Sequence, residues 1–250
     1  MAKIFSVSNH KGGVGKTTST VNIGAALALK GKKVLLVDLD PQANLTQSLG
    51  VKNTTLTIYD YLKGQTAICT TEVKKNLYVI PSSLDLSAAE IELSSEPGRE
   101  YLLKDILSSI QKNFDYILID CPPSLGLLTI NALTASDSVI IPLQAEFLPL
   151  KGLAKLKEVI EKIKKRLNPN LEIGCVFLTQ YDTRKILNRD IAESVKSFFG
   201  EKLLDTKISN NVALAEAPSQ GKDIFMYNRA SKGAADYKDL CNELYEKKVV

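Results

Sequence analysis

The segment at residues 10–18 reads HKGGVGKTT and carries the residue types of a phosphate-binding loop. A short apolar run precedes it and an alanine-rich segment follows it, so we expect a strand to enter the loop and a helix to leave it. Its glycines let the backbone turn several N–H groups inward, and the helix N-terminus adds positive potential. In such a loop Lys16 reaches the β- and γ-phosphates of a nucleotide, and the hydroxyl of Thr17 binds Mg²⁺.

One position departs from the usual pattern GxxxxGK[ST], because His10 stands where that pattern has its first glycine. The alternative is an ordinary glycine-rich turn that contains an incidental Gly-Lys-Thr. The flanking strand and helix favour the phosphate loop over this alternative. We therefore predict that the nucleotide contacts Gly12, Gly13, Val14, Gly15, Lys16, Thr17 and Thr18.

Acidic residues end two further apolar runs. The run at 33–38 leads into Asp38 and Asp40, and the run at 116–120 ends in Asp120. The carboxyl ends of parallel strands lie at one edge of a sheet, which is where the phosphate loop also lies. A carboxylate there can orient the water that attacks a phosphate, and an acid at the tip of a buried strand can hold Mg²⁺, as we predict for Asp120. The alternative for the first pair is two surface aspartates that open a turn.

Short β-branched runs alternate along the chain with longer amphipathic or alanine-rich segments. The runs are almost continuously apolar, as in a parallel sheet covered on both faces. Predicted strands lie at 3–8, 33–38, 77–81, 116–120, 138–143, 173–179 and 203–209, and predicted helices at 16–30, 85–95, 99–112, 126–135, 151–167, 186–199 and 233–247. We expect an α/β fold of P-loop NTPase type, with a doubly wound, mostly parallel sheet and helices on both faces. No linker or repeat divides residues 1–250, so we predict a single domain.

Composition and the distribution of apolar residues and cysteines disfavour several classes of protein. The chain has 250 residues with 32 Lys and Arg against 28 Asp and Glu, and this net charge of +4 is too small to indicate nucleic-acid binding by itself. The N-terminus lacks the apolar core of a signal peptide, and no run approaches the roughly 18 apolar residues of a membrane span, so we expect a cytoplasmic protein without a membrane partner. The cysteines are far apart, which disfavours zinc ribbons and disulfides and favours buried free thiols; they are Cys69, Cys121, Cys175 and Cys241.

The loop sequence KGGVGKTT resembles the deviant Walker A motif of the ParA/MinD group of ATPases. The segments DLDPQ at 38–42 and DCPPS at 120–124 are similar to the same group, and the resemblance to ParA-type (Soj-like) partition ATPases covers essentially the whole chain. It implies ATP and Mg²⁺ as cofactors. The implied catalytic residues are Lys11, Lys16 and Asp40, and the implied Mg²⁺ site has Thr17 and Asp120 with Asp38 supporting the shell or the loop.

The resemblance also implies a mode of action. In this group the lysine at position 11 crosses a dimer interface to the partner's nucleotide, although Lys11 could also merely solvate the edge of the loop. The ATP homodimer is expected to bind nonspecific DNA, which associates it with the nucleoid, and a ParB-like or other adaptor is expected to stimulate slow hydrolysis. The expected role is chromosome or plasmid segregation or the positioning of another cargo. Segments after the last strands wall the adenine site, which makes Thr179, Gln180, Ser209 and Asn211 candidate base contacts.

The expected DNA surface departs from the family. ParA proteins that bind nonspecific DNA commonly carry arginines in a stretch like IPRNVRLSEAPS, where this chain has Asn210 and Ala213. We therefore expect DNA binding to rest on Arg189, Lys207, Lys222 and Lys232. The cationic run at 151–166 is expected to be a solvated helix face instead.

Other functions share the phosphate loop. A membrane-cycling MinD-type ATPase requires an amphipathic C-terminal helix, whereas this chain ends in YEKKVV. An iron–sulfur reductase ATPase requires suitably placed cysteines. A small-molecule kinase or ligase is compatible with the loop but gives Lys11 no evident purpose.

Overall fold

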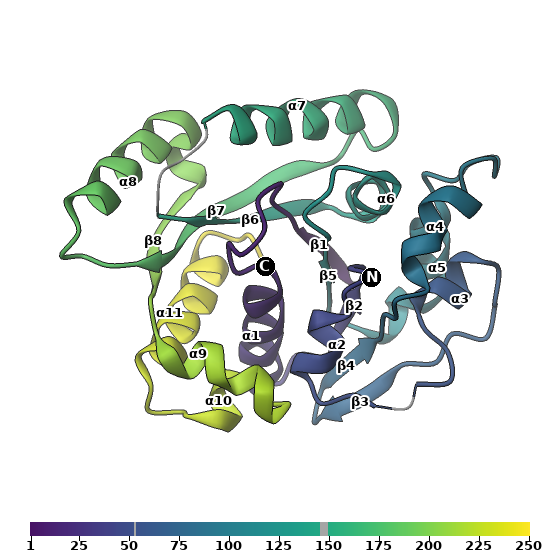
Figure 1. Ribbon diagram of the computed structural model, residues 1–250, viewed down its shortest axis with the longest axis horizontal. Helices are drawn as coiled ribbons and strands as arrows, with labels where there is room; N and C mark the ends of the chain where they lie inside the picture. Colours follow the sequence, from purple (N-terminus) through teal and green to yellow (C-terminus); the bar gives the residue numbers. More distant parts are fainter. Residues whose placement is uncertain (53, 146–149) are drawn as a thin grey trace.

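The computed structural model describes residues 1–52, 54–145 and 150–250. Within these residues the strands form one sheet in the order β3-β4-β2-β5-β1-β6-β7-β8, and every neighbouring pair is parallel except β3 with β4 (Figure 1). The strands are β1 (Lys3–Val7), β2 (Val34–Asp38), β3 (Thr71–Lys74), β4 (Leu77–Ile80), β5 (Tyr116–Asp120), β6 (Ser138–Gln144), β7 (Glu172–Tyr181) and β8 (Leu203–Ser209). This arrangement confirms the predicted doubly wound α/β fold.

Helices cover both faces of the sheet, as the connections between parallel strands require (Figure 1). The α-helices are α1 (Lys16–Leu29), α2 (Asn44–Ser48), α3 (Ile58–Leu62), α4 (Leu86–Glu92), α5 (Leu102–Ile110), α6 (Leu127–Ala135), α7 (Leu150–Arg166), α8 (Ile186–Phe199), α9 (Val212–Glu216), α10 (Ile224–Tyr227) and α11 (Lys232–Glu246). Short 3₁₀ turns are η1 (Gln111–Asn113), η2 (Gly200–Lys202) and η3 (Ala217–Gln220).

Successive residues of each central strand enter different cores. In β2, Leu36 packs with α1 and α11 in one core, whereas Leu35 and Val37 pack with α3, α4 and α5 in the core on the opposite face. A third core lies between β6, β7 and the helices α7 and α8. Burial on both faces explains why these strands read as nearly continuous apolar runs. It also fixes the carboxyl ends of β1, β2 and β5 side by side, because their residues pair in register from Val34 and Lys3 onward.

All of the predicted strands and helices are present, with boundaries that differ by up to three residues. The sequence reading missed the antiparallel edge strand β3 and the short helices α2, α3, α9 and α10. Strand β3 reads TEVK, and its side chains are exposed or half-buried, so it lacks the apolar signal of the central strands.

Candidate active site

The loop between β1 and α1 has the backbone that a phosphate cradle requires. Gly13 and Gly15 have φ values of 74° and 86°, in the left-handed region that favours glycine. Asn9 shapes the entry to the loop, because its Oδ1 accepts from the Lys11 amide at 3.0 Å and its Nδ2 donates to the Pro142 carbonyl at 2.8 Å. The first residues of α1, Lys16, Thr17 and Thr18, line the cavity beside this turn.

Lys16 lies inside this loop, with 7% of its surface exposed. Its ammonium donates to the carbonyl oxygen of Lys11 at 3.2 Å. Burial lowers the pKa of Lys16, and the nearby Asp120 carboxylate opposes that effect. A cation held in a dry loop interacts strongly with an anion that enters the loop, which suits the predicted contact with the β- and γ-phosphates.

Asp120 ends β5 directly behind the loop and is fully buried. Its carboxylate accepts from the hydroxyl of Thr17 at 2.6 Å and from the hydroxyl of Thr20 at 3.2 Å. Burial raises the pKa of Asp120 to about 8, and the charge of Asp38 adds to this rise. A hydroxyl oxygen beside a carboxylate is a donor set that suits Mg²⁺, so Thr17 and Asp120 fit the predicted metal site.

Asp38 and Asp40 have different partners. The carboxylate of Asp38 accepts from the amide and the hydroxyl of Thr46 in α2, at 2.8 and 2.7 Å. Burial raises the pKa of Asp38 to about 6. Asp40 Oδ1 accepts from the Gln42 amide at 3.0 Å, and the Asp40 carbonyl accepts from Ser82. Asp38 thus fastens α2 below the loop, while Asp40 lies at the wall of the phosphate pocket.

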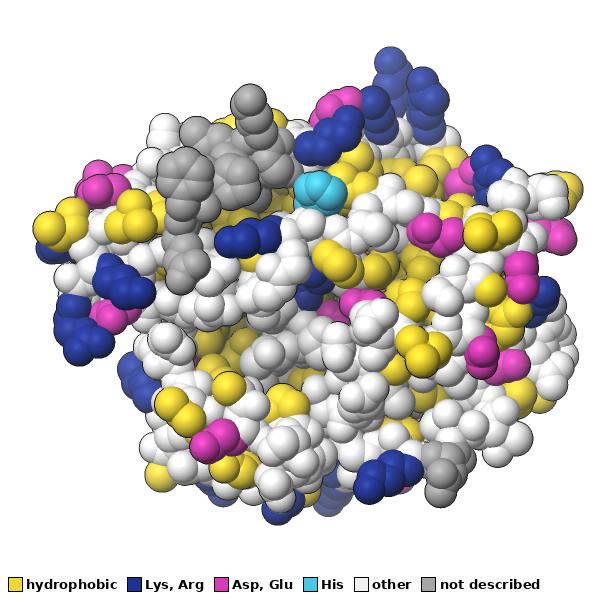
Figure 2. All heavy atoms as spheres, viewed as in Figure 1, with side chains coloured by type: hydrophobic (Ala, Val, Ile, Leu, Met, Phe, Trp, Pro, Cys, Tyr) yellow, Lys and Arg dark blue, Asp and Glu magenta, His cyan; other side chains and the backbone are white. Residues whose placement is uncertain are grey.

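Two cavities meet at the loop. One of about 450 Å³ is lined by Lys16, Thr17 and Asp40, and one of about 300 Å³ extends past Gly15 between β7 and α11. They share Gly15, Thr18 and Gln180 as lining residues. On this face the molecular surface is hollowed near its centre, with charged side chains inside the hollow (Figure 2). The adjoining cavities have the layout of a phosphate site beside a base site.

The second cavity brings together the four predicted base contacts. Thr179, Gln180, Ser209 and Asn211 all line it. The Oδ1 atom of Asn211 is buried and has no hydrogen-bond partner among the described residues. A buried acceptor without a partner is costly, so this atom is suited to receive a donor from a ligand, such as the exocyclic amine of adenine. The contact to adenine itself stays a prediction.

Lys11 differs from Lys16, because its side chain is exposed at the rim of the loop. Its ammonium donates to Gln144 Oε1 at the end of β6, at 3.0 Å. Sequence reading missed Gln144, Asn9 and Thr20, which contact the loop or Asp120. Their only sequence signal is a polar residue just beyond the end of a predicted strand or near the N-terminus of α1.

The predicted DNA contacts lie on four different elements near the C-terminal part of the chain. Arg189 in α8 and Lys222 after η3 are exposed. Lys207 in β8 lies over the ring of Tyr181 at 4.8 Å, and Lys232 forms a 2.8 Å ion pair with Asp236. These contacts occupy two of the four cations, and the four together stay a prediction. On α7, Lys155 and Lys162 both pair with Glu158, which agrees with a solvated face.

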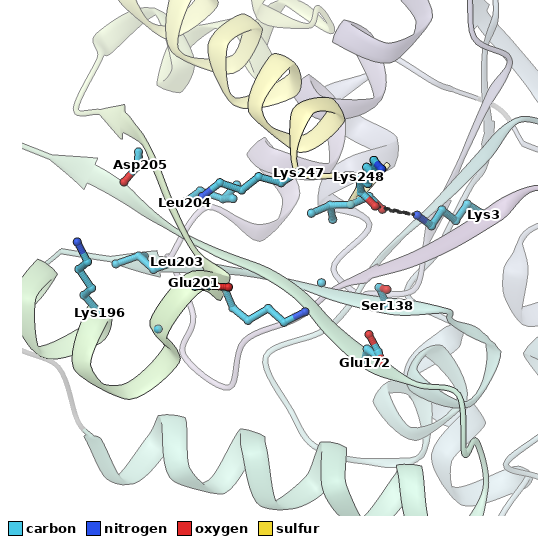
Figure 3. A pocket seen from close by; sticks show the side chains of 14 residues that line it. Lys3, Ser138, Glu172, Lys196, Glu201, Leu203, Leu204, Asp205, Lys247 and Lys248 are labelled. Atoms are coloured by element: carbon cyan, nitrogen blue, oxygen red, sulfur yellow. Dashed lines mark hydrogen bonds between the residues drawn. The ribbon is translucent and has the colours of Figure 1, made fainter.

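Another cavity, of about 910 Å³, lies at the amino ends of β6, β7 and β8 (Figure 3). Lys3 donates there to the Val249 carbonyl at 2.7 Å, and Glu172 and Glu201 lie among the lining lysines. It contains none of the predicted site residues and lies at the end of the strands opposite the phosphate loop. Its volume exceeds that of either cavity at the phosphate loop, so volume does not indicate the predicted site.

The cysteines and helices limit two alternatives. All four cysteines are free; Cys121, Cys175 and Cys241 are buried as predicted, but Cys69 is exposed, because it lies in the surface segment before β3. Within residues 1–52, 54–145 and 150–250, no three His, Cys, Asp or Glu side chains are grouped as a metal site. In the same residues no helix has both the length and the apolar composition needed to cross a bilayer.

Comparison with known proteins identifies the family. A family described as an AAA domain matches residues 2–173. The chain is 49% identical to the sporulation initiation inhibitor protein Soj of Bacillus subtilis, with 98% of each chain covered. It is 47% identical to the chromosome-partitioning ATPase Soj of Treponema pallidum, over 98% of this chain and 97% of the relative. The chain belongs to the Soj/ParA family of partition ATPases. Membership in Soj/ParA confirms the predicted family and the predicted class of enzyme.

Solved structures agree with the Soj/ParA fold. A putative plasmid partition protein of Borrelia burgdorferi bound to AMPPNP has a TM-score of 0.86 and 28% identity, covering 99% of this chain and all of the other. A Mycobacterium smegmatis protein described as cobyrinic acid a,c-diamide synthase, with bound ADP and magnesium, has a TM-score of 0.86 and 35% identity, covering 98% and 95%. Both of these proteins were solved with an adenine nucleotide or its analogue.

Proposed function

We propose that this Soj/ParA ATPase is a dimerisation switch controlled by ATP. ATP joins two subunits across their phosphate loops, the dimer binds DNA without sequence preference, and hydrolysis releases the dimer from DNA. The observation that carries the proposal is the different placement of the two lysines of this loop. Lys16 lies inside the loop of its own subunit, whereas the ammonium of Lys11 lies exposed at the rim, where a second subunit can present its phosphates.

ATP and Mg²⁺ are the cofactors of the proposed switch. Thr17 and Asp120 would hold the ion, with Asp38 as a further predicted member of its shell. Bound Mg²⁺ supplies positive charge that offsets the charge of the phosphate oxygens. Lys16 neutralises the phosphates from inside the loop, and Asp40 orients the attacking water from the wall of the same cavity.

The proposed cycle also includes partners. The γ-phosphate supplies contacts that only the dimer makes, so hydrolysis removes the reason for association. A ParB-like or other adaptor protein would bind the ATP dimer and stimulate its slow hydrolysis. The ATP state would then be associated with the nucleoid, and the protein would segregate a chromosome or plasmid or position another cargo.

Sedimentation of the Lys11→Ala protein tests this switch. Two proteins are compared, Asp40→Ala alone and Asp40→Ala with Lys11→Ala. The Asp40→Ala substitution is expected to slow hydrolysis and keep ATP bound in both. The Lys11→Ala protein should bind ATP as a monomer, because it loses contacts to the partner's nucleotide while keeping those within its own loop. A normal ATP dimer of Lys11→Ala would refute the cross-subunit role. Wild-type turnover of Asp40→Ala would transfer the hydrolytic role to another residue, with Asp38 next.

A second function has one observation in its favour. The Mycobacterium smegmatis structure, at 35% identity, is described as a cobyrinic acid a,c-diamide synthase. A ligase of that kind would couple ATP hydrolysis to amide formation at carboxylates of cobyrinic acid. Stimulation of ATP hydrolysis by cobyrinic acid and a source of ammonia, together with no ATP-dependent dimer, would favour the ligase. The opposite pair of results is what the switch predicts.

A further inference from the structure

A chain of three hydrogen bonds links Lys11 to two strand ends and returns to its own loop. Lys11 Nζ donates to Gln144 Oε1 at 3.0 Å. Gln144 Nε2 donates to Gln180 Oε1 at 2.8 Å, and Gln180 Nε2 donates to the Gly13 carbonyl at 2.8 Å. Gln144 is therefore held from one side while it holds Lys11 from the other.

The platform behind Gln144 is rigid. The backbone of Gln180 has a φ of 51°, a left-handed conformation that costs about 1 kcal/mol or more in a residue other than glycine. The preceding residue, Thr179, donates its hydroxyl to the Val14 carbonyl at 2.8 Å. The end of β7 is thus fastened to the phosphate loop at two points. A side chain that rests on this platform has a fixed position relative to the loop.

Gln144 is the hydrogen-bond acceptor of an ammonium that has no ion pair among the described residues. We propose that Gln144 is a positioning residue that holds Lys11 on its own subunit, so that Lys11 must leave Gln144 when the ATP dimer forms. This inference rests on the cross-subunit role proposed above for Lys11. Gln144 then sets the threshold for dimerisation without contacting the nucleotide.

Because the side chain at position 144 is a neutral amide, releasing Lys11 from it costs only a moderate free energy. The bond has a charged donor but is exposed to solvent, which reduces its contribution to a factor of about five in an equilibrium. A carboxylate acceptor adds an ion pair to the same hydrogen bond and contributes more. A two-fold dimer releases both lysines, so each change per subunit enters the dimerisation constant twice. Removing the acceptor should tighten the dimer, and replacing it with a carboxylate should weaken the dimer.

Two substitutions of Gln144 test the inference, because they should change the dimerisation constant in opposite directions. The dimerisation constant is measured by sedimentation with ATP and Mg²⁺ in the Asp40→Ala background. Gln144→Ala should tighten the dimer by up to about 25-fold, as two factors of five, and Gln144→Glu should weaken it. Equal signs for the two variants, or no change in either, would overturn the proposal.

A second measurement follows Lys11 in the monomer, without nucleotide. Limiting acetic anhydride labels accessible amines, and mass spectrometry gives the rate at Lys11 relative to the exposed Lys112. Relative labelling of Lys11 should rise at least twofold in Gln144→Ala and fall in Gln144→Glu. Identical rates in all three proteins would also overturn the proposal.

Gln42→Glu is the matched control for added charge. Gln42 lines the phosphate cavity, and among the described residues no hydrogen bond joins it to Lys11, so this variant should leave Lys11 labelling unchanged. The two proposals also fail separately. A normal Lys11→Ala dimer refutes the cross-subunit role whatever the labelling shows. If the rate of Lys11 labelling is the same with Gln, Ala or Glu at position 144 and the Lys11→Ala protein is a monomer, only the role of Gln144 is refuted.

Discussion

At the scale of single residues, the strength of ligand binding at the site depends on which charged side chains are buried away from water. Lys16, Asp38 and Asp120 are buried, and the charges of Lys16 and Asp38 both act on Asp120, while Lys11 is exposed a few residues away. Interactions in a dry site are strong, so each buried charge has a large effect on what the loop can bind. The exposed Lys11 is bound to Gln144, and the proposed switch requires it to leave Gln144 for a second subunit.

Replacing Lys16 tests the phosphate loop. Lys16→Ala should reduce ATP affinity at least 100-fold, because it removes the only loop cation among the described residues that is held inside the cradle. A bond to a charged group contributes about 1.5–3 kcal/mol, and burial increases that value. Thr17→Ala is the comparison, and it should chiefly reduce the dependence of binding and hydrolysis on Mg²⁺. Isothermal titration with and without Mg²⁺ measures both, and normal ATP affinity of Lys16→Ala would refute the loop assignment.

The buried carboxyl of Asp120 predicts a pH effect on stability. Its pKa is about 8 in the folded protein, against an ordinary value of 3.8. Between these values the folded protein keeps a proton that the unfolded chain has released, so the free energy of unfolding falls as the pH rises from about 4 to 8. Asp120→Asn removes this loss and should raise the melting temperature at pH 8 by at least about 2 °C in EDTA without nucleotide.

The same variant separates stability from metal binding. Asp38 remains in Asp120→Asn, and its pKa of about 6 leaves a smaller fall in stability between pH 4 and 6. Mg²⁺-dependent ATP hydrolysis should be lost even though the fold is more stable. If the melting temperature depends on pH in the same way in Asp120→Asn and in the original protein between pH 5 and 8, Asp120 is not the titrating group.

Much of this site followed from residue types alone. Lys16, Thr17 and Asp120 converge as predicted, because a Gly-rich loop after one strand and an acid after its neighbour must meet at the carboxyl edge of a parallel sheet. Asn9, Thr20 and Gln144 did not follow, since a single Asn, Thr or Gln has many uses and only the folded chain shows its partner. The role of Asp38 toward Thr46 depended on α2, which was not predicted.

At the scale of elements, α2 connects the active site with the C-terminal segments. Asp38 holds Thr46 at the middle of α2, and the residue pair Gly50 and Gly221 brings the end of that helix against η3. A Cβ atom on Gly221 would lie 2.7 Å from the Gly50 Cα, so a larger residue forces the two segments apart. This contact places the end of α2, which Asp38 holds at Thr46, against the segment that carries Lys222.

Gly221→Ala tests this close approach. Gly221 has a φ of 62°, so alanine adds left-handed strain as well as the clash with Gly50. The free energy of unfolding in urea should fall by about 2–4 kcal/mol, as strain and overpacking add. Gly98→Ala is the matched control, because Gly98 has a φ of 70° and nothing within 4 Å of the added Cβ. Equal losses in the two variants would show that the packing of α2 against η3 contributes nothing.

The missed elements share a physical cause. Helix α2 has five residues, NLTQS, and β3 has four, TEVK, so neither is long enough to show a hydrophobic period. Their positions come from contacts with distant residues: Asp38 fixes α2, and Lys74 at the end of β3 pairs with Asp223 near α10. The long strands were predictable because burial on both faces of the sheet leaves a continuous apolar run.

At the scale of the whole molecule, the proposed switch joins a nucleotide site to a DNA surface. The net charge of +4 gives little overall attraction to DNA, so binding depends on the cations at the contact surface, and a dimer presents twice as many of these as a monomer. Arg189 and Lys222 are exposed, whereas Lys207 and Lys232 already contact Tyr181 and Asp236. We therefore expect weak binding by the monomer and a strong dependence on the ATP dimer.

The most direct test is fluorescence anisotropy of a random-sequence duplex, titrated with the protein in ATP or ADP from 50 to 200 mM salt. We expect tight binding with ATP and much weaker binding with ADP, in both cases without sequence preference. Binding should weaken along a straight line of log affinity against log salt, because each phosphate contact releases about 0.9 counterion. Replacing the four predicted cations with alanine should reduce the slope of that line. Absence of DNA binding by the ATP dimer at 50 mM salt, or equal binding with ADP, would contradict the proposed switch.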